Sequence, residues 1–391
     1  MALPGWASSA SAFVRHDDPA EMSALDRCAS YEDYRTLVQR RLPRLLFDYV
    51  DGGSFSETTL RRNAADLAEV VIEQRVARDM SATAIGTTLF GQPLAMPLVL
   101  APVGFAGMYA RRGEMQAARA ASAAGVPFCL STLGICSAAE LGAAGLPYWF
   151  QLYIVRDRGF VSALVDRIRA LGCSTLVVTV DLPRPATRYR DLRSGMTGRL
   201  DALGTLRRWI DGATHPAWLW DVHLQGRPHA FGNFEGVAPA AGGFAAAWEW
   251  IGANFDESVT WDDLAALRAQ WTGTLIVKGI LHPDDARAAI AIGADGIVVS
   301  NHGGRQLDGA SSTIAMLPRI AEAVDGAATV LVDGGIRSGL DLLKMAQAGA
   351  DACLIGRAWV MALAAGGERG VTQLLDQFAS QYRAGRILSG S

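Results

Sequence analysis

Cysteine and charged residues are both scarce in this chain of 391 residues. Its five cysteines are odd in number, scattered mostly inside apolar runs, and show no spacing typical of a metal site. This pattern argues against a disulfide framework and predicts reduced thiols in a reducing compartment. Charged residues make up only 19% and the formal net charge is -3, so the composition offers no general attraction to nucleic acid.

The sequence also lacks an unbroken apolar run of the kind that crosses a membrane. The N-terminal region has no apolar signal core, because Arg-His-Asp-Asp at residues 15–18 interrupts it. Residues 80–110 form a 31-residue stretch without a charge, but three prolines and four glycines divide it. We expect a loop, a short strand and another loop there.

Half of the residues are hydrophobic, enough for a large core. Continuous apolar runs, as expected of strands covered on both faces, lie at 98–104, 128–132, 148–153, 175–181, 274–280, 296–301, 329–335 and 351–356. Helix-like segments separate most of them, at 113–124, 158–171, 283–292, 317–324 and 338–348. This alternation predicts an α/β fold, a closed (β/α)8 TIM barrel, with a doubly wound open sheet as the alternative.

We expect residues 1–391 to form one domain. Residues 1–97 would be an N-terminal extension and helical cap with helices at 31–39 and 43–50, residues 98–359 the barrel, and residues 360–391 a C-terminal helix and tail. A long Trp-rich insertion loop at 195–260 follows the fourth strand, and seven of the ten tryptophans lie between Trp209 and Trp271. Two interpretations stay open: a lid over an active site, or a segment whose Trp rings lie among lipid headgroups.

Polar side chains follow the strands at the carboxyl ends, where such barrels have their active sites. They are Tyr153, Asp181, Lys278, His302, Asp333 and Arg357. A barrel core needs apolar layers and does not need six polar groups at one rim, so packing alone does not explain them. His302 can accept a proton and Arg305 can bind a carboxylate, with two glycines between them, which indicates a site that oxidises a small acid.

Two glycine-rich turns follow the last two strands, at 333–339 and at 355–357. Backbone N–H groups at such turns, beside a helix N-terminus and an arginine, form a phosphate site. No G-x-G-x-x-G motif follows an early strand, so a mononucleotide or a phosphorylated substrate is expected rather than a dinucleotide. Lys278, inside an apolar strand, would hold a positive charge against an anionic group; the alternative is a strand-end lysine that reaches solvent.

Together these motifs resemble the FMN-dependent (S)-2-hydroxyacid dehydrogenase and oxidase family. The matching segments are Phe-Gln-Leu-Tyr at 150–153, Thr-Val-Asp at 179–181, Ser-Asn-His-Gly-Gly-Arg-Gln-Leu-Asp-Gly at 300–309, and Asp-Gly-Gly-Ile-Arg at 333–337. They run in family order, and the likeness extends from about residue 31 to 359. Within the family, segments 47–53, 101–104 and 108–114 are most similar to the bacterial respiratory L-lactate dehydrogenases.

The resemblance implies catalytic roles for His302, Asp181 and Tyr153. His302 would remove a proton from the substrate as two electrons pass to the flavin, and Asp181 would orient it. Tyr153 would contact the 2-hydroxyl. The residues implied around the substrate are Tyr49, Tyr153, Arg188 and Arg305, with both arginines and Tyr49 on the carboxylate.

The resemblance also implies FMN, bound without a covalent link, and no metal. The backbone of Ala101, Pro102, Val103 and Gly104 would pack against the flavin ring, with Ser131, Gln151 and Thr179 on its edge. Lys278 would lie near N1 and stabilise the reduced form. The residues implied around ribityl and phosphate are Asp333, Gly334, Gly335, Arg337, Gly356 and Arg357.

What the resemblance implies is oxidation of L-lactate to pyruvate, with electrons passed to a membrane quinone by a peripheral protein at the cytoplasmic face of the bacterial inner membrane. Gly104, often alanine in the oxidases, favours a dehydrogenase, and no haem domain is recognisable, so the acceptor would be external. The alternative is an oxidase or dehydrogenase for another (S)-2-hydroxyacid such as glycolate or mandelate, using oxygen or another acceptor. An FMN-dependent isomerase and a flavin-binding scaffold are further alternatives. A homo-oligomer is expected by analogy with family members.

Overall fold

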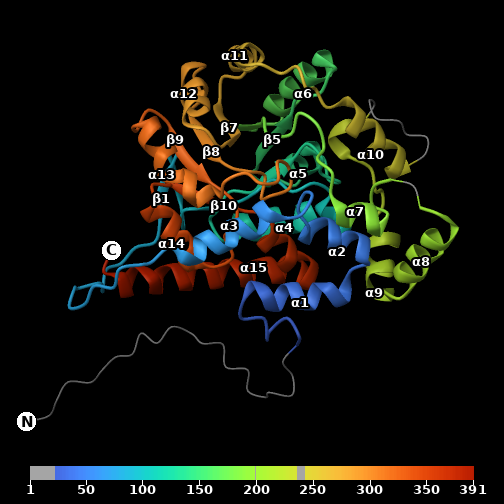
Figure 1. Ribbon diagram of the computed structural model, residues 1–391, viewed down its shortest axis with the longest axis horizontal. Helices are drawn as coiled ribbons and strands as arrows, with labels where there is room; N and C mark the ends of the chain where they lie inside the picture. Colours follow the sequence, from blue (N-terminus) through green and yellow to red (C-terminus); the bar gives the residue numbers. More distant parts are fainter. Residues whose placement is uncertain (1–22, 199, 236–242) are drawn as a thin grey trace, which may run out of the picture.

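A closed barrel of parallel strands ringed by helices forms the centre of the molecule, a computed structural model that describes residues 23–198, 200–235 and 243–391 (Figure 1). Its strands are β3 (Leu98–Leu100), β4 (Cys129–Ser131), β5 (Trp149–Tyr153), β6 (Thr175–Thr179), β7 (Thr274–Ile280), β8 (Gly296–Val299), β9 (Thr329–Val332) and β10 (Ala352–Ile355). Neighbours follow chain order, β10 pairs with β3, and a parallel bridge from Leu100 to Phe128 joins β3 to β4. The (β/α)8 barrel is therefore confirmed and the open sheet is wrong.

The strand sequences are apolar on both faces because each face is buried. In β6, Val177 lies in the cluster that fills the barrel interior with Ile276, Val298 and Leu331. Its neighbours Leu176 and Val178 belong to the larger cluster formed with the surrounding helices. This double burial explains why the strands read as continuous apolar runs rather than alternating ones.

Helices follow the strands and cover the barrel. They are α4 (Gly113–Ala123), α5 (Ala138–Ala143), α6 (Arg158–Ala170), α11 (Trp261–Gln270), α12 (Pro283–Ala291), α13 (Thr313–Val324), α14 (Gly339–Gln347) and α15 (Arg357–Ser389). The helix expected at 317–324 begins four residues earlier, and Pro318 lies inside it. Proline usually lies in the first turn of a helix, and a start next to Pro318 was therefore expected. The helix in fact begins earlier in the sequence. In α15, non-helical angles at Gly366 and Gly367 mark a kink between two helical parts.

The segment before the barrel combines three helices with a hairpin. The helices are α1 (Tyr31–Arg41), α2 (Arg44–Asp51) and α3 (Thr58–Glu69), and β1 (Thr87–Leu89) pairs antiparallel with β2 (Gln92–Leu94). Phe90, at the hairpin turn, packs edge-on against Trp149 with ring centroids 6.0 Å apart. Trp149 begins β5, so the hairpin covers the amino ends of the strands. The first 22 residues of the expected N-terminal extension lie outside the described residues.

The chain between β6 and α11, which includes the insertion expected as an irregular loop at 195–260, is largely helical. It contains α7 (Tyr189–Ser194), α8 (Ala202–Ala213), α9 (Pro216–Trp218), the π-helix η3 (Leu219–Leu224), the 3-10 turn η4 (Gly232–Phe234) and α10 (Gly243–Asn254). Capping explains part of this helicity, since Asp201 accepts a hydrogen bond from Gly204 N and Pro216 occupies the first turn of α9. Residue 199 and residues 236–242 of the insertion lie outside the described residues.

Side-chain and backbone contacts attach the insertion to the barrel loops. Trp218 Nε1 donates to the carbonyl of Met108 at 2.8 Å, in the short η2 turn (Ala106–Met108) after β3. At the far end, the carbonyl of Asn254 accepts from Arg156 N at 3.0 Å. In Figure 1 the insertion, coloured green to yellow, projects to the right of the barrel. Within the described ranges, no helix is long and apolar enough to span a bilayer.

Candidate active site

A cavity of about 410 Å³ opens at the carboxyl ends of the strands. Its wall includes every residue expected around substrate and flavin except Ser131, Gln151 and Asp181. These three lie directly behind the wall: Asp181 bonds to His302, and Ser131 Oγ donates to Gln151 Oε1 at 3.0 Å. The fold thus brings together residues that are more than 300 positions apart, such as Tyr49 and Arg357.

The turn after β8 directs His302 into the cavity. His302 itself has a φ of 57°, and the two glycines that follow are also left-handed. A Cβ at Gly304 would lie 2.4 Å from Leu60 N, so this position requires glycine. The backbone N–H of His302 donates to Ser300 Oγ at 3.0 Å, which fixes the start of the turn.

His302 and Asp181 form a largely buried pair, with 16% and 12% of their side-chain surfaces exposed. The Nδ1 atom of His302 lies 2.7 Å from Asp181 Oδ1. Burial lowers the pKa of His302 below its ordinary value, against the opposing effect of Asp181. Burial disfavours ionisation of Asp181, yet the hydrogen bond with His302 and the charge of Lys278 hold its pKa below the ordinary range. The imidazole is therefore neutral at neutral pH, and its Nε2 is the nitrogen left to accept a proton.

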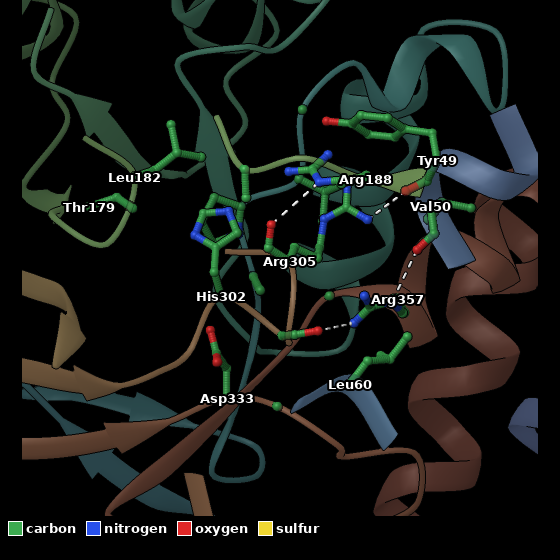
Figure 2. A pocket seen from close by; sticks show the side chains of 18 of the residues that line it. Tyr49, Val50, Leu60, Thr179, Leu182, Arg188, His302, Arg305, Asp333 and Arg357 are labelled. Carbon is green, nitrogen blue, oxygen red and sulfur yellow. Dashed lines mark hydrogen bonds between the residues drawn. The ribbon is translucent and has the colours of Figure 1, made fainter. Parts of the chain in front are cut away.

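The guanidinium groups of Arg188 and Arg305 both lie beside the ring of Tyr49. Arg305 Cζ lies 4.6 Å and Arg188 Cζ 5.2 Å from the ring centroid, and Figure 2 shows both beside the tyrosine. Arg305 also donates to the carbonyls of Tyr49 and Gly52. Burial, and then the neighbouring charge of Arg188, lower the pKa of Arg305. Two closely spaced cations, of which Arg188 is buried and Arg305 partly buried, attract a small anion such as a carboxylate.

Lys278 is a buried charge rather than a strand-end lysine that reaches solvent, since only 5% of its surface is exposed. Its Nζ lies 2.9 Å from Asp333 Oδ2 and donates to Ser300 Oγ at 2.7 Å. Burial opposes the charge, but Asp333 and Asp181 outweigh burial and raise the pKa of Lys278. The ammonium group therefore stays protonated in the cavity wall.

Several buried polar atoms near this lysine have no hydrogen-bond partner among the described residues. They are Gln151 Nε2, Thr179 Oγ1 and Asp333 Oδ1. Thr179 and Asp333 line the cavity, and Gln151 precedes them on the neighbouring strand β5. Buried polar groups are normally paired, so a ligand with amide-like donors and acceptors would complete this wall. A flavin ring has such an edge.

The arginines at the other end of the cavity are already bonded to the protein. Arg357 donates to the carbonyls of Val50, Gly52 and Gly303 at 2.7–3.0 Å, and burial lowers its pKa to about 10. Arg337 pairs with Glu32 at 3.1 Å, and its Cζ lies 4.6 Å from the ring of Tyr31. Both line the cavity, but their observed bonds hold the surrounding loops.

Sequence reasoning missed other residues of the wall, among them Tyr31, Asp191, Leu182, Trp248 and Phe255. Asp191 Oδ2 lies 3.6 Å from Arg188 Nη1, and both side chains are buried. The three-residue spacing of this pair in a helical turn was a usable signal. Trp248 and Phe255 gave no comparable signal, because the insertion is rich in aromatic residues throughout.

The model of the FMN-dependent dehydrogenase family matches residues 38–390. The chain belongs to the FMN-dependent dehydrogenase family. It is therefore an oxidoreductase whose cofactor is FMN, and the unpaired polar atoms of the cavity wall fit such a ligand.

Related proteins cover nearly the whole chain. An L-lactate dehydrogenase of Chromohalobacter salexigens is 53% identical over 360 residues, covering 92% of this chain and 91% of the relative. One of Caulobacter vibrioides is 54% identical over 366 residues, covering 93% and 94%. A solved structure of the monotopic membrane protein (S)-mandelate dehydrogenase is 34% identical, with a TM-score of 0.87, covering 93% and 96%. A mandelate oxidase structure is 38% identical, with a TM-score of 0.78, covering 93% and 94%.

Proposed function

We propose that this FMN-dependent dehydrogenase oxidises L-lactate to pyruvate and passes the electrons to a membrane quinone. The observation that carries the proposal is the His302–Asp181 pair beside two arginines in one cavity. Relatives at 53–54% identity, named L-lactate dehydrogenase, support the choice of substrate.

The proposed chemistry assigns one task to each group. Arg188 and Arg305 hold the substrate carboxylate, with the hydroxyl of Tyr49 beside it. His302 accepts a proton from the substrate at Nε2, and Asp181 stabilises the imidazolium that forms. Tyr153, whose pKa is raised by burial and by Asp181, keeps its proton and donates to the substrate oxygen at C2. When bound, FMN would supply the acceptor for the two electrons and the second proton that leave the substrate.

FMN would be held by three groups of residues. The backbone of 101–104 would pack on the ring, and Ser131, Gln151, Thr179 and Lys278 would surround its polar edge. The glycine turns after β9 and β10 would hold ribityl and phosphate with backbone N–H groups. The residues proposed there are Asp333, Gly334, Gly335, Arg337, Gly356 and Arg357.

We propose a peripheral position at the cytoplasmic face of the bacterial inner membrane, where the acceptor would be a quinone. The insertion carries an exposed apolar surface on α8, formed by Leu203, Leu206, Trp209 and Ile210. The relative with the TM-score of 0.87 is described as a monotopic membrane protein. All five cysteines are free, which fits a reducing compartment.

A bulkier substrate such as (S)-mandelate is the second candidate, favoured by the solved structures with that name. Anaerobic mixing of the FMN-loaded protein with L-lactate, D-lactate and (S)-mandelate separates the candidates through the visible absorbance of the flavin. We expect rapid bleaching with L-lactate and none with D-lactate. A faster response to (S)-mandelate than to L-lactate would replace the proposed substrate, and no response to any 2-hydroxyacid would favour an isomerase.

A further inference from the structure

Two aromatic side chains of the insertion form part of the cavity wall. Trp248 lies on α10, and Phe255 follows directly after that helix. The insertion therefore contributes to the substrate end of the cavity as well as to the outer surface. The proposed function gives neither residue a task.

Trp248 contacts a cluster of rings that includes a proposed substrate ligand. Its ring meets Tyr49 edge-on, with centroids 6.1 Å apart at 80°, and meets Phe105 at 5.5 Å and 88°. It also stacks on Phe231 at 6.2 Å and 24°. Rings that pack in these orientations hold one another in place, so the indole has a defined position in the wall.

Phe255 makes the equivalent contact with the second tyrosine. Its ring meets Tyr153 edge-on at 5.3 Å and 84°. A backbone bridge between Val155 and Phe255 anchors this end of α10 to the loop after β5. Each tyrosine proposed to bind the substrate is thus backed by an aromatic ring from α10 or from the residue that follows it.

This arrangement determines which part of the substrate meets the insertion. In the proposed complex, Arg188 and Arg305 bind the carboxylate and Tyr153 binds the hydroxyl. Both polar groups of the acid then have partners in the protein. Its remaining group, the side chain on C2, must face apolar wall. Trp248 and Phe255 form the part of that wall that lies beside the two tyrosines, and Leu133 and Leu182 are further apolar residues of the lining.

We propose that Trp248 sets the upper size limit for the C2 side chain, so that a methyl group is accepted and a phenyl group is rejected. This inference rests on the proposed function for the positions of carboxylate and hydroxyl. The wall can discriminate between substrates by the size of the C2 side chain, because closely packed aromatic rings cannot move aside for a larger group without losing their contacts. Phe255 forms the adjoining wall and contributes less than Trp248 to the size limit.

The test compares Trp248→Ala, Trp248→Phe and a matched control, Trp250→Ala. Trp250 lies on the same helix but packs on Phe234, with centroids 6.3 Å apart, and is absent from the cavity wall. For each FMN-loaded protein, kcat/KM is measured with L-lactate, (S)-2-hydroxybutanoate and (S)-mandelate. Binding of propionate and phenylacetate, which lack the reacting hydroxyl, is followed by the perturbation of the flavin spectrum.

We expect Trp248→Ala to raise the ratio of (S)-mandelate to L-lactate in kcat/KM by about tenfold or more, with a parallel gain for phenylacetate over propionate. Trp248→Phe, which keeps a ring in the cluster, should give an intermediate value. Trp250→Ala should leave both ratios within about threefold of the unchanged protein. Equal ratios in Trp248→Ala and the unchanged protein, or an equal rise in Trp250→Ala, would overturn the inference.

The unchanged protein tests the proposed function separately. If it prefers (S)-mandelate to L-lactate, both the proposed substrate and the rejection of a phenyl group are refuted. If it oxidises neither acid, the proposed function fails, and the effect of Trp248 is then judged from the two non-reacting acids, whose relative binding does not depend on turnover. Unchanged relative binding in both Trp248 variants would refute the size limit even where L-lactate proves to be the substrate.

Discussion

At the scale of single residues, burial decides the protonation state on which the proposed reaction depends. His302 is largely buried and its pKa is lowered, so it is neutral and ready to accept a proton at neutral pH. Asp181 opposes this shift and is itself held ionised by the hydrogen bond with His302 and by the charge of Lys278. The carboxylate, the ammonium group and the neutral imidazole therefore set one another's protonation states.

Asp181→Asn tests this coupling through the pH dependence of kcat/KM. Removing the carboxylate removes the charge and the hydrogen bond of Asp181, which both raise the pKa of His302, so this pKa should fall further. A base with a lower pKa stays neutral to lower pH, and the acid limb of the profile should therefore move to lower pH. The rate at the plateau should fall by about 10²- to 10⁴-fold, because the imidazolium loses its stabilising partner.

His302→Gln is the reference for that experiment. It should retain bound FMN, with an unchanged flavin spectrum, and lose measurable turnover. An acid limb in Asp181→Asn that stays in place or moves to higher pH would contradict the assigned coupling. Near-normal turnover in His302→Gln would contradict the role of the histidine.

The sequence was informative for residues whose role follows from their position at a strand end. His302, Lys278 and Asp333 each come at or just after a barrel strand, and the barrel brings such ends together. Asp191 and Trp248 were not predicted, because their place in the wall depends on how the insertion folds back over the site. The bonding of Arg357 to three carbonyls was also not predictable, since its partners are distant in sequence.

At the scale of elements, α8 is a helix of 12 residues none of which is buried. Leu203, Leu206 and Ile210 are each more than half exposed, and Trp209 is 70% exposed. Their spacing places them on one side of the helix, with Arg207 and Arg208 between them. An apolar face with neighbouring arginines is typical of a helix that lies in the interface of an anionic bilayer.

The double variant Leu206→Ser and Trp209→Ser should weaken binding to phosphatidylglycerol-containing vesicles by about tenfold or more. Sedimentation of the protein with vesicles measures the change. Val71→Ser with Val76→Ser is a suitable control, because these valines are 82% and 77% exposed on another part of the chain. Equal loss in both double variants, or no loss in the first, would remove α8 as the membrane contact.

The internal structure of the insertion was the least predictable element. The barrel strands could be located because a continuous apolar run is typical of a strand that is covered on both faces. The insertion lies outside the repeating strand–helix pattern. Its helices depend on local caps and on contacts such as that of Trp218 with Met108. The hairpin at 87–94 was missed for a similar reason, since its strands are only three residues long.

At the scale of the whole molecule, the two ends of the barrel have separate tasks. The carboxyl ends of the strands hold the cavity with its buried charges, and the amino ends are covered by the hairpin with Phe90 at its turn. Charges buried without full pairing oppose folding, whereas apolar contacts favour it. Stability and catalysis should therefore respond to different substitutions.

Phe90→Ala tests this separation. Loss of the ring contact with Trp149 should lower the free energy of unfolding by about 1–3 kcal/mol, seen as a lower Tm of the FMN-loaded protein. Well below that Tm, kcat/KM for L-lactate should equal that of the unchanged protein, because the hairpin lies at the end of the barrel away from His302. Phe90→Leu, which keeps an apolar side chain, should recover part of the lost stability. A fall in kcat/KM at temperatures where Phe90→Ala is fully folded would show that strain at the amino end reaches the site, and the two ends would then not be independent.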